Sequence, residues 1–463
     1  MTEPTGGERR ALLNSSAVRD LAKRVRGTVL TPDAAGYDGA RRVFNAMIDR
    51  YPALILQCAG VADVIEGVHF ARDHQVPLTI RGGGHSVAGS AVCDGGLLLD
   101  LAPMKGIRVD PAQRRAQAQT GLLLQEFDHE TQAFGLATTL GVVSVTGIAG
   151  LTLGGGLGWL NGKYGLACDN VLAADMVTAD GALVTANAAE HQNLYWALRG
   201  GGGNFGVVTS LTYQLHPVRT VLAGGFSYPC EQARDALRFY HDWACQTPDE
   251  LSTAASVGRD DAGLPMASIA VCYCGSLEDG ERVLQPLRAF GSPIAGEVAP
   301  ASYESVQRAR DAGFPSGRHH YWKSSYLKEL PDEAIDALLE AASASPSVLN
   351  GVGLQQMSGV ASRVDPQATA FAHRDRQYDF LILSQWQDPA ESEANILWAR
   401  QCFESMRPFL KEAVYVNNLG DEGQDRVRAA YGVNYERLAL VKAQYDPDNF
   451  FRRNHNIAPS RQE

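Results

Sequence analysis

The chain has 463 residues, a length that predicts about two or three domains or one large two-lobed enzyme. Its residues are 45% hydrophobic, which is ordinary for a globular protein with a core. Its formal net charge of -11 at pH 7 argues against nucleic acid as a partner, because phosphate binding needs clustered lysine and arginine side chains. The chain has no run of about 18 apolar residues, so we expect no membrane span.

The N-terminal residues and the cysteines bear on the cellular compartment. Residues 1–16 are polar and lack the apolar segment of a secretory signal, so we expect a cytoplasmic protein. Eight cysteines are scattered along the chain without a CxxC motif, and we expect buried, reduced thiols rather than disulfides or a metal site. Cys272 and Cys274 are expected to share one face of a strand.

The first half of the chain alternates between strand and helix signals. Residues 51–60 predict a strand, residues 61–75 have helical apolar spacing, and residues 77–84 predict a second strand that ends in glycines. This order is typical of a nucleotide-binding βαβ unit. Further signals predict strands over 95–104 and 114–121, a helix over 122–136, and alternating elements over 183–218.

Beyond about residue 217 the pattern becomes that of an α+β lobe, in which an antiparallel sheet carries helices on one face. The stretch 431–451 predicts a last helix, which Asp446 and Pro447 stop. Strands are predicted over 265–275, 349–359 and 378–386, and helices over 332–345 and 391–410.

Three glycine-rich stretches lie in the first half of the chain, at 81–89, 147–165 and 199–208. One such stretch is usually a tight turn. Three together favour loops whose backbone amides approach a ligand closely and cradle pyrophosphate oxygens. No P-loop is present, which disfavours ATP hydrolysis. The Rossmann dinucleotide-binding fingerprint also fits poorly.

His85 directly follows the three glycines of the first stretch. A lone histidine usually makes a hydrogen bond to neighbouring backbone. Behind a glycine nest, its imidazole would instead lie beside the bound group, and an imidazole is also a nucleophile capable of a covalent bond.

Five stretches carry a resemblance to a known family: "RGGGHSVAG" from residue 81, "GGLLLDL" from 95, "GLTLGGGLGWLNGKYGLACDNV" from 150, "GGGGNFGVVTSLTY" from 200 and "YDPDNFFRRNHNI" from 445. The chain resembles the berberine-bridge-enzyme-like FAD-linked oxidases of the vanillyl-alcohol-oxidase/p-cresol-methylhydroxylase superfamily. The resemblance implies an α+β, two-lobed FAD-binding fold with an antiparallel-sheet substrate domain. It implies an FAD-binding domain over 1–217, to which 415–463 return, and a substrate-binding domain over 218–414.

The family also implies how FAD is held. Its first-motif histidine carries FAD through the 8α-methyl group, which implies a covalent tether at His85. Some members have a second tether, a cysteine, but Val143 stands in that position, so we expect one tether, and we expect Cys168 in the core. The full set of implied cofactor contacts is Arg81, Gly82, Gly83, Gly84, His85, Ser86, Gly89, Gly141, Val142, Thr146, Gly147, Gly150, Leu151, Gly154, Gly155, Gly156, Gly158, Tyr164, Gly165, Asp169, Gly206, Val207, Tyr415, Asn417, Asn454 and Asn456.

The catalytic positions depart from the family pattern. Relatives have a tyrosine after the "HS" of the first motif and another in "YxNY" near the C-terminus, where this chain has Val87 and Asn418. An asparagine cannot act as a base, so Asn418 would orient a substrate by hydrogen bonding. In strand 378–386 we expect Phe380 and Ile382 to face the flavin, which disfavours a sugar substrate because a sugar needs a polar groove.

The candidate catalytic set also includes two residues of the predicted substrate-binding domain, Tyr326 and Gln355, and Thr146 of the FAD-binding domain. Tyr326, in "HHYWKSSYL", is either a base or a residue that merely lines the pocket. Gln355, in "GLQQMSG", is the other polar candidate of the substrate domain. Structural roles are expected for Trp322 and Lys323.

Thr146 occupies the family position that controls access of O₂ to the flavin. Its hydroxyl could donate a hydrogen bond to O₂, or it could merely close a turn before Gly147. Leu151 replaces a histidine common in relatives. The pair Thr146 and Leu151 resembles the bacterial polyketide-tailoring branch, in which a flavin N5-oxide is the oxygenating species.

The sequence therefore predicts an FAD-dependent oxidase of a small, fairly apolar organic substrate, an alcohol, amine or secondary-metabolite intermediate, with O₂ reduced to H₂O₂. The alternative is a flavin-N5-oxide-type oxygenase in secondary metabolism. A sugar oxidase and a non-catalytic flavoprotein are less favoured. No metal, nucleic-acid or membrane partner is expected, and no particular oligomeric state is predicted.

Overall fold

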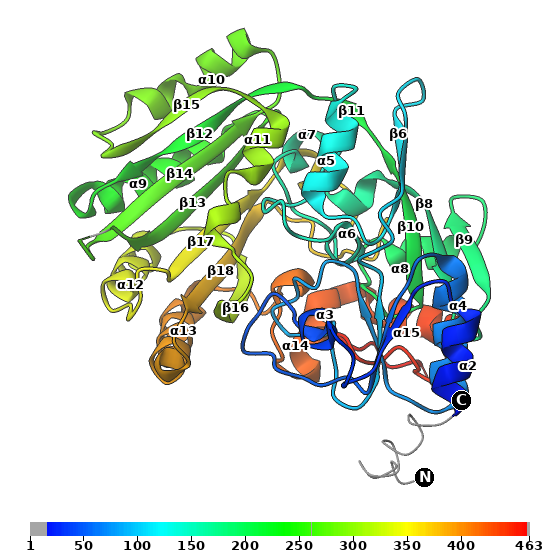
Figure 1. Cartoon of the computed structure of the whole chain (residues 1–463). Coiled ribbons are helices and arrows are strands. Elements are labelled where there is room, and N and C mark those ends of the chain that lie inside the picture. Colours follow the sequence, from blue (N-terminus) through cyan, green and yellow to red (C-terminus); the bar gives the residue numbers. More distant parts are fainter. Residues whose placement is uncertain (1–15, 261, 461–463) are drawn as a thin grey trace.

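The computed structural model describes residues 16–260 and 262–460 (Figure 1). Residues 1–15, on which the expectation of no secretory signal mainly rests, lie outside the described residues. Within the described ranges, no helix is long and apolar enough to cross a membrane. The same ranges contain no group of three or more His, Cys, Asp or Glu side chains that could hold a metal ion.

A four-stranded sheet, in the order β1-β2-β4-β3, leads into the first glycine motif. β2 (Leu54–Gln57) and β3 (Leu78–Arg81) both pair in parallel with β4 (Leu97–Asp100), and β1 (Thr28–Leu30) is antiparallel to β2. Helix α4 (Val61–Asp73) connects β2 to β3. The predicted βαβ unit is confirmed, with β4 lying between its two strands. The glycines follow directly where β3 ends.

A second, five-stranded sheet is antiparallel, in the order β5-β6-β10-β8-β9. Phe127, Leu211 and Leu438 belong to one hydrophobic cluster, so the last helix of the chain packs against strands of its first half. That helix ends before Asp446, as predicted. The bounds are β5 (Ile107–Asp110), β6 (Arg115–Gln119), β10 (Val207–Gln214), β8 (Val171–Val177), β9 (Leu183–Asn187), α5 (Leu124–Gln132), α8 (Gln192–Leu198) and α15 (Tyr435–Tyr445).

A seven-stranded antiparallel sheet fills the middle of the chain, in the order β15-β12-β14-β13-β17-β18-β16 (Figure 1). Tyr240, Leu284, Ile335 and Trp398, one from each of four helices, pack in one cluster with residues of these strands, so the predicted helix-covered face is confirmed. The bounds are β15 (Ala295–Ser302), β12 (Thr220–Tyr228), β14 (Pro265–Tyr273), β13 (Leu251–Arg259), β17 (Gly351–Met357), β18 (Gln377–Trp386), β16 (His319–Leu327), α9 (Cys230–Ala244), α10 (Leu277–Ala289), α12 (Asp332–Ser343) and α13 (Ser392–Met406).

Short elements connect the three sheets. β7 and β11 pair with each other, and the 3-10 helices η1 to η7 lie in connecting loops. The bounds are α2 (Ser16–Arg24), α3 (Tyr37–Arg41), α6 (Ile148–Leu153), α7 (Asn161–Tyr164), α11 (Tyr303–Arg308), α14 (Gln424–Tyr431), β7 (Leu136–Ala137), β11 (His216–Pro217), η1 (Ala167–Asn170), η2 (Asp311–Gly313), η3 (Gly359–Ser362), η4 (Pro389–Glu391), η5 (Arg407–Phe409), η6 (Val416–Asn418) and η7 (Gly432–Asn434).

The eight cysteines are all free thiols. Cys272 and Cys274 contact the same hydrophobic cluster, as predicted, although β14 ends at Tyr273 and Cys274 lies just beyond the strand. The expectation that the thiols are buried is wrong for Cys230 and Cys245, which are exposed at the two ends of α9. The ends of an amphipathic helix reach solvent even where its middle is covered.

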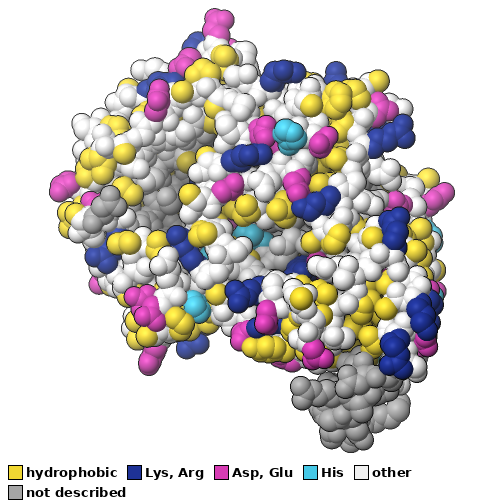
Figure 2. Space-filling view, viewed as in Figure 1, with side chains coloured by type: hydrophobic (Ala, Val, Ile, Leu, Met, Phe, Trp, Pro, Cys, Tyr) yellow, Lys and Arg dark blue, Asp and Glu magenta, His cyan; other side chains and the backbone are white. Residues whose placement is uncertain are grey.

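Charges of both signs are mixed over the surface. On the face drawn in Figure 2, lysine and arginine side chains alternate with aspartate and glutamate. Some form exposed ion pairs, such as Arg234 with Asp336. Pairs of this kind contribute little to stability because solvent screens them.

Candidate active site

A cavity of about 360 Å³ gathers residues from segments far apart in the sequence. Its walls come from the three glycine-rich stretches, from three strands of the seven-stranded sheet and from the C-terminal segment. The residues that line it are Ile80, Gly82, Gly83, Gly84, His85, Ser86, Ser90, Ala91, Gly141, Val142, Val143, Thr146, Gly147, Gly150, Leu151, Gly154, Leu157, Gly202, Gly203, Asn204, Phe314, Trp322, Gln355, Asp379, Leu381, Tyr415, Val416, Asn417, Asn418, Tyr431, Arg453, Asn454 and His455.

Two glycine loops cross in the wall of this cavity. A Cβ atom on Gly83 would lie 2.4 Å from the backbone nitrogen of Gly147, and one on Gly147 would lie 2.5 Å from the backbone nitrogen of Gly83. Side chains are therefore excluded from both positions. Gly84 has a φ of 67°, a left-handed conformation that favours glycine. The loops thus bring backbone close to the cavity, as a diphosphate cradle requires.

His85 lines the cavity directly after these glycines. Its Nε2 atom is buried and has no hydrogen-bond partner among the described residues. Burial lowers the pKa of His85 to about 4, because it disfavours the charged imidazolium. A neutral imidazole keeps a lone pair, so this side chain fits a covalently held cofactor.

The seven-stranded sheet places a carboxyl group in the cavity that the sequence did not single out. Asp379 of β18 is 5% exposed, and its Oδ2 accepts a hydrogen bond of 2.7 Å from Asn418 Nδ2. Its Oδ1 is buried without a partner among the described residues. Burial raises the pKa of Asp379 to about 7. A carboxyl with this pKa is suited to accept a proton near neutral pH.

The expectation that Phe380 and Ile382 face the flavin is wrong. Both pack in the hydrophobic cluster under the helices, whereas Asp379 and Leu381 line the cavity. Because successive residues of a strand point to opposite faces, an error of one position exchanges the whole set. The only local signal for Asp379 is that it is the single acidic residue of β18 and directly precedes the apolar run 380–383.

The other candidate catalytic residues occupy different places. Gln355 lines the cavity and pairs across the sheet with Asp379. Asn418 lines it too, as the partner of that carboxyl. Tyr326 pairs with Asp379 on the other side but is 1% exposed, and burial holds its pKa well above the usual range. A hydroxyl with a raised pKa is a poor source of a base, and Tyr326 is not among the residues that line the cavity.

The C-terminal segment holds the second glycine loop. The hydroxyl of Tyr415 accepts hydrogen bonds from the backbone of Gly156 at 2.9 Å and from Asn417 Nδ2 at 2.7 Å. The same Asn417 amide donates to the carbonyl of Leu151 at 2.9 Å. A Cβ on Gly154 would lie 2.0 Å from the Asn417 side-chain oxygen. Tyr415 and Asn417 thus contact both the cavity and the loop.

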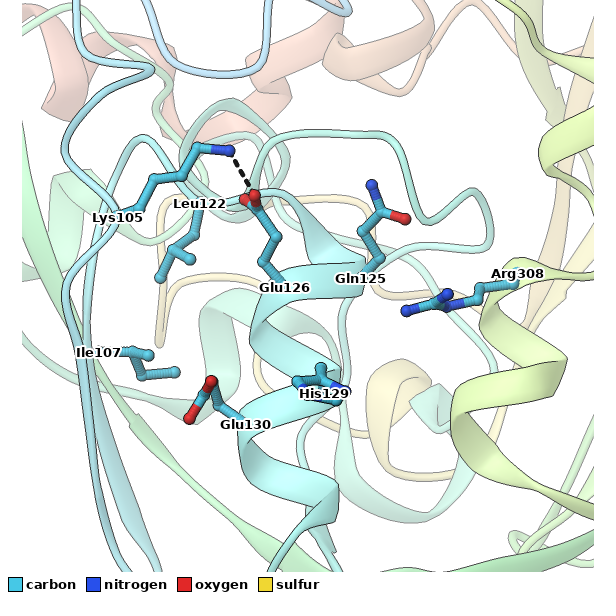
Figure 3. Close-up of a pocket in the computed structure, with 8 residues that line it drawn as sticks. All are labelled: Lys105, Ile107, Leu122, Gln125, Glu126, His129, Glu130 and Arg308. Carbon is cyan, nitrogen blue, oxygen red and sulfur yellow. Dashed lines mark hydrogen bonds and ion pairs between the residues drawn. The ribbon is translucent and has the colours of Figure 1, made fainter.

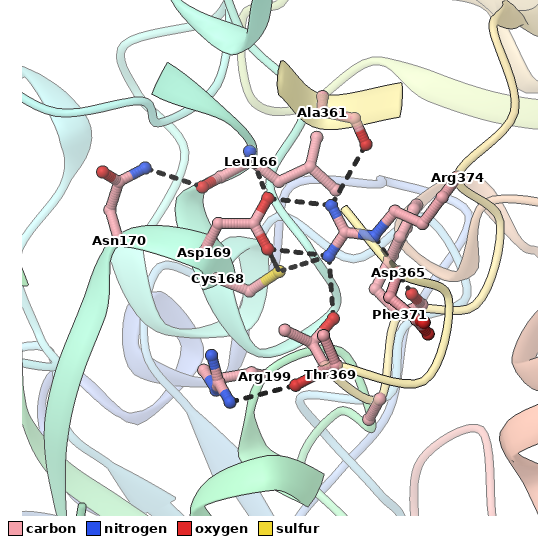
Figure 4. Close-up of polar contacts among 12 residues, drawn as sticks. Leu166, Cys168, Asp169, Asn170, Arg199, Ala361, Asp365, Thr369, Phe371 and Arg374 are labelled. Atoms are coloured by element: carbon pink, nitrogen blue, oxygen red, sulfur yellow. Dashed lines mark hydrogen bonds and ion pairs between the residues drawn. The ribbon is translucent and has the colours of Figure 1, made fainter. Parts of the chain in front are cut away.

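Several expected cofactor contacts support the walls instead of lining the cavity. Arg81 forms an ion pair with Asp100, 2.6 Å between Nη2 and Oδ2. Asp169 is held by both terminal nitrogens of Arg374, at 2.7 and 2.8 Å, and Thr369 accepts a further hydrogen bond from that guanidinium (Figure 4). The other expected contacts that do not line the cavity are Gly89, Gly155, Gly156, Gly158, Tyr164, Gly165, Gly206, Val207 and Asn456.

The residues that bear on the second tether and on oxygen also have clear positions. Val143 lines the cavity, so no thiol is available there. Cys168 is completely buried, as expected, beside the Asp169–Arg374 pair (Figure 4). Thr146 and Leu151 both line the cavity.

A second pocket, of about 410 Å³, lies on α5 (Figure 3). Lys105 and Glu126, which pair with each other, line it together with His129 and Arg308. The side chains of the Lys105–Glu126 pair are 44% and 31% exposed. This pocket contains none of the predicted site residues, so the glycine-lined cavity is the candidate active site.

Known proteins match the chain along nearly its whole length. A family model described as FAD binding domain matches residues 52–187, and one described as Berberine and berberine like matches residues 414–458. The chain is 32% identical to (R)-6-hydroxynicotine oxidase of Paenarthrobacter nicotinovorans, over 94% of this chain and 97% of that protein. It is 30% identical to an FAD-linked oxidoreductase of Dictyostelium discoideum, over 96% and 97%.

The fold agrees with these matches. The crystal structure of 6-hydroxy-D-nicotine oxidase from Arthrobacter nicotinovorans aligns with a TM-score of 0.88 and 31% identity, and the alignment covers 94% of this chain and 98% of that one. The two matched family segments are the ones that meet at the cavity, since 82–85 and 415–418 both line it. The chain therefore belongs to the berberine-bridge-enzyme-like family of FAD-linked oxidoreductases, with the FAD-binding fold of the vanillyl-alcohol-oxidase/p-cresol-methylhydroxylase superfamily.

Proposed function

We propose that the protein is an FAD-dependent oxidase of a small, fairly apolar organic substrate, with O₂ as the electron acceptor and H₂O₂ as the product. One observation carries the proposal: a neutral histidine behind a glycine cradle and a buried carboxyl line the same cavity. Phe314, Trp322 and Leu381 supply apolar walls beside them. Such a site suits an alcohol, an amine or a secondary-metabolite intermediate.

His85 would hold FAD through a single covalent bond. Gly82, Gly83 and Gly147 would offer backbone amides to the diphosphate, and Val143 leaves no thiol for a second bond. When bound, FAD supplies the hydride acceptor of the reaction.

Asp379 would take the proton that substrate oxidation releases from a hydroxyl or amine. Asn418 donates to one carboxyl oxygen and so leaves the other, Oδ1, for the substrate. Gln355, the cross-strand neighbour, would orient the substrate by hydrogen bonding. The apolar walls exclude water around this group, which keeps the carboxyl pKa near the pH at which it must work.

The test of the tether is acid precipitation of the purified protein. We expect yellow colour to stay with the wild-type pellet and to pass into the supernatant for His85→Ala, because the variant lacks the nucleophile. His69→Ala is the matched control, since His69 lies on α4, contacts the carbonyl of Asp180 and is not among the residues that line the cavity. Wild-type colour that leaves the pellet contradicts the tether.

The substrate class is tested by peroxide release from a panel of alcohols, amines, 6-hydroxynicotine and oligosaccharides. 6-Hydroxynicotine enters the panel because a relative is named for it. Oligosaccharides enter because Asp379 and Gln355 make the sheet face more polar than predicted. Turnover of oligosaccharides alone contradicts the proposal of an apolar substrate.

Reoxidation of the reduced flavin tests the oxidase itself. A protein whose reduced flavin does not reoxidise in air is not an oxidase, and this result favours a non-catalytic flavoprotein.

An oxygenase remains the second candidate, because Thr146 and its hydroxyl lie in the cavity wall. Reaction under ¹⁸O₂ separates the two functions. An oxidase leaves the label in H₂O₂, whereas an oxygenase transfers it to the organic product.

A further inference from the structure

Phe44 stacks on the ring of His85. The ring centroids are 3.8 Å apart and the planes differ by 16°. On its other side Phe44 stacks on His320, at 4.2 Å and 25°. Phe44 is 3% exposed and lies in the loop after α3, some forty positions before the glycine motif. No sequence motif points to this contact.

The backbone around Phe44 fixes the stack at three points. The Phe44 amide donates to the carbonyl of Gly84 at 3.0 Å, immediately before His85. The Asn45 side chain donates to the carbonyls of Val87 at 2.9 Å and His320 at 3.0 Å. The amide of His320 donates back to Asn45 at 3.0 Å. The loop that carries Phe44 therefore connects the glycine motif to β16. Its hydrogen bonds fix the position of the Phe44 ring between the imidazoles of His85 and His320.

We propose that Phe44 is a positioning residue for covalent attachment of FAD: its ring holds the plane of the His85 imidazole so that a ring nitrogen meets the flavin. This inference rests on the tether proposed above. The contact also keeps the imidazole among apolar atoms, with Trp322 at the edge of the Phe44 ring, 6.2 Å between centroids. An imidazole in such surroundings stays neutral and nucleophilic.

Covalent attachment of FAD to His85 is an oxidation, and O₂ is the oxidant. A bond forms between a His85 ring nitrogen and the 8α carbon of FAD, while the 8α-methyl and the imidazole N–H each lose a proton. The two electrons released reduce the flavin, and O₂ takes up two electrons and two protons to become H₂O₂. Phe44 takes no part in the bonding and acts only through the orientation of His85.

The test compares Phe44→Leu and Phe44→Tyr with the wild type. Each protein is purified, its covalent flavin fraction is measured by acid precipitation, and remaining apoprotein is incubated in air with excess FAD to follow attachment over time. We expect Phe44→Leu to attach FAD about three- to tenfold more slowly, the factor that one aromatic stack is worth in a rate. Phe44→Tyr keeps the stack and should attach FAD at close to the wild-type rate.

Phe70→Leu is the matched control, because Phe70 is also 3% exposed and also touches a histidine, His74, at 4.6 Å between centroids. It should lower the melting temperature as Phe44→Leu does but leave the attachment rate unchanged. If Phe44→Leu does not fold, Phe44→Met, which fills the space flexibly without a ring plane, replaces it.

The outcomes separate the two proposals. A wild type without covalent flavin contradicts the tether, and this inference with it. A wild type with covalent flavin and a Phe44→Leu protein that attaches FAD at the wild-type rate overturns this inference while the tether stands. Equal slowing by Phe70→Leu also overturns it, because the effect is then one of general stability.

Discussion

Burial acts in opposite directions on Asp379 and His85, which line the same cavity. It raises the pKa of the carboxyl to about 7 and lowers the pKa of the imidazole to about 4, because in each case it disfavours the charged form. The sequence predicted His85, since three glycines precede it. It did not predict Asp379, because what makes this residue exceptional is its surroundings, which come from β16, β17 and η6.

Asp379→Asn tests the role of the carboxyl. We expect kcat/KM to fall by about 10²–10⁴-fold, the usual contribution of a positioned base, while FAD content stays unchanged. Asp375→Asn is the control, since Asp375 is exposed and pairs with Lys411 at the surface. Steady-state kinetics by peroxide release measure both. Wild-type kcat/KM in Asp379→Asn contradicts a role as proton acceptor.

The raised pKa of Asp379 also predicts a pH dependence. The base must be ionised to act, so kcat/KM should rise with pH and level off above about 7.

The stability of the folded protein should change with pH in the opposite direction. Between the unfolded pKa of about 3.9 and the folded pKa, the folded state binds a proton that the unfolded state has lost, so stability falls as pH rises. Urea unfolding measured across this pH range should show that the free energy of unfolding falls more steeply with pH for the wild type than for Asp379→Asn. An equal dependence on pH in the two proteins would contradict the raised pKa of Asp379.

At the scale of elements, the register of β18 decides which side chains reach the cavity. Composition and spacing predicted the strand itself, and the helices beneath the sheet were predicted as well. Which face of β18 is covered depends on its pairing with β16 and β17, and the apolar run 380–383 carries no alternation to mark it. The crossing of the two glycine loops is likewise a contact between distant segments, although both loops were recognised as glycine-rich.

Gly83→Ala tests that crossing. The new methyl group would meet the backbone nitrogen of Gly147 at 2.4 Å, and backbone cannot move aside as a side-chain end can. We expect a loss of stability of about 1–3 kcal/mol and lower FAD content. Gly39→Ala is the control, because nothing lies within 4 Å of its Cβ. Thermal unfolding and flavin absorbance per protein measure the two effects, and a Gly83→Ala protein that matches Gly39→Ala in both contradicts the tight crossing.

In the whole molecule, the cavity exists only because the C-terminal segment returns to the glycine loops of the first half of the chain. Residues 415–418 close over loops that begin before residue 90, and the buried ion pair of Lys442 and Asp446 anchors the segment that follows, with 2.6 Å between Nζ and Oδ2. Local patterns do not encode such long-range contacts, and only the family resemblance predicted the return. The exact division into an FAD-binding domain and a substrate-binding domain at residues 217 and 415 stays a prediction.

We propose that this assembled cavity holds FAD on His85. The most direct measurement is the mass of the tryptic peptide 82–105, which contains His85 and no other histidine. We expect this peptide from the wild type to carry the mass of a flavin adduct, with fragments that assign it to His85, and we expect no second peptide to be crosslinked to it. An unmodified peptide 82–105 from yellow protein, or an adduct on any other residue, would contradict a covalent bond between FAD and His85.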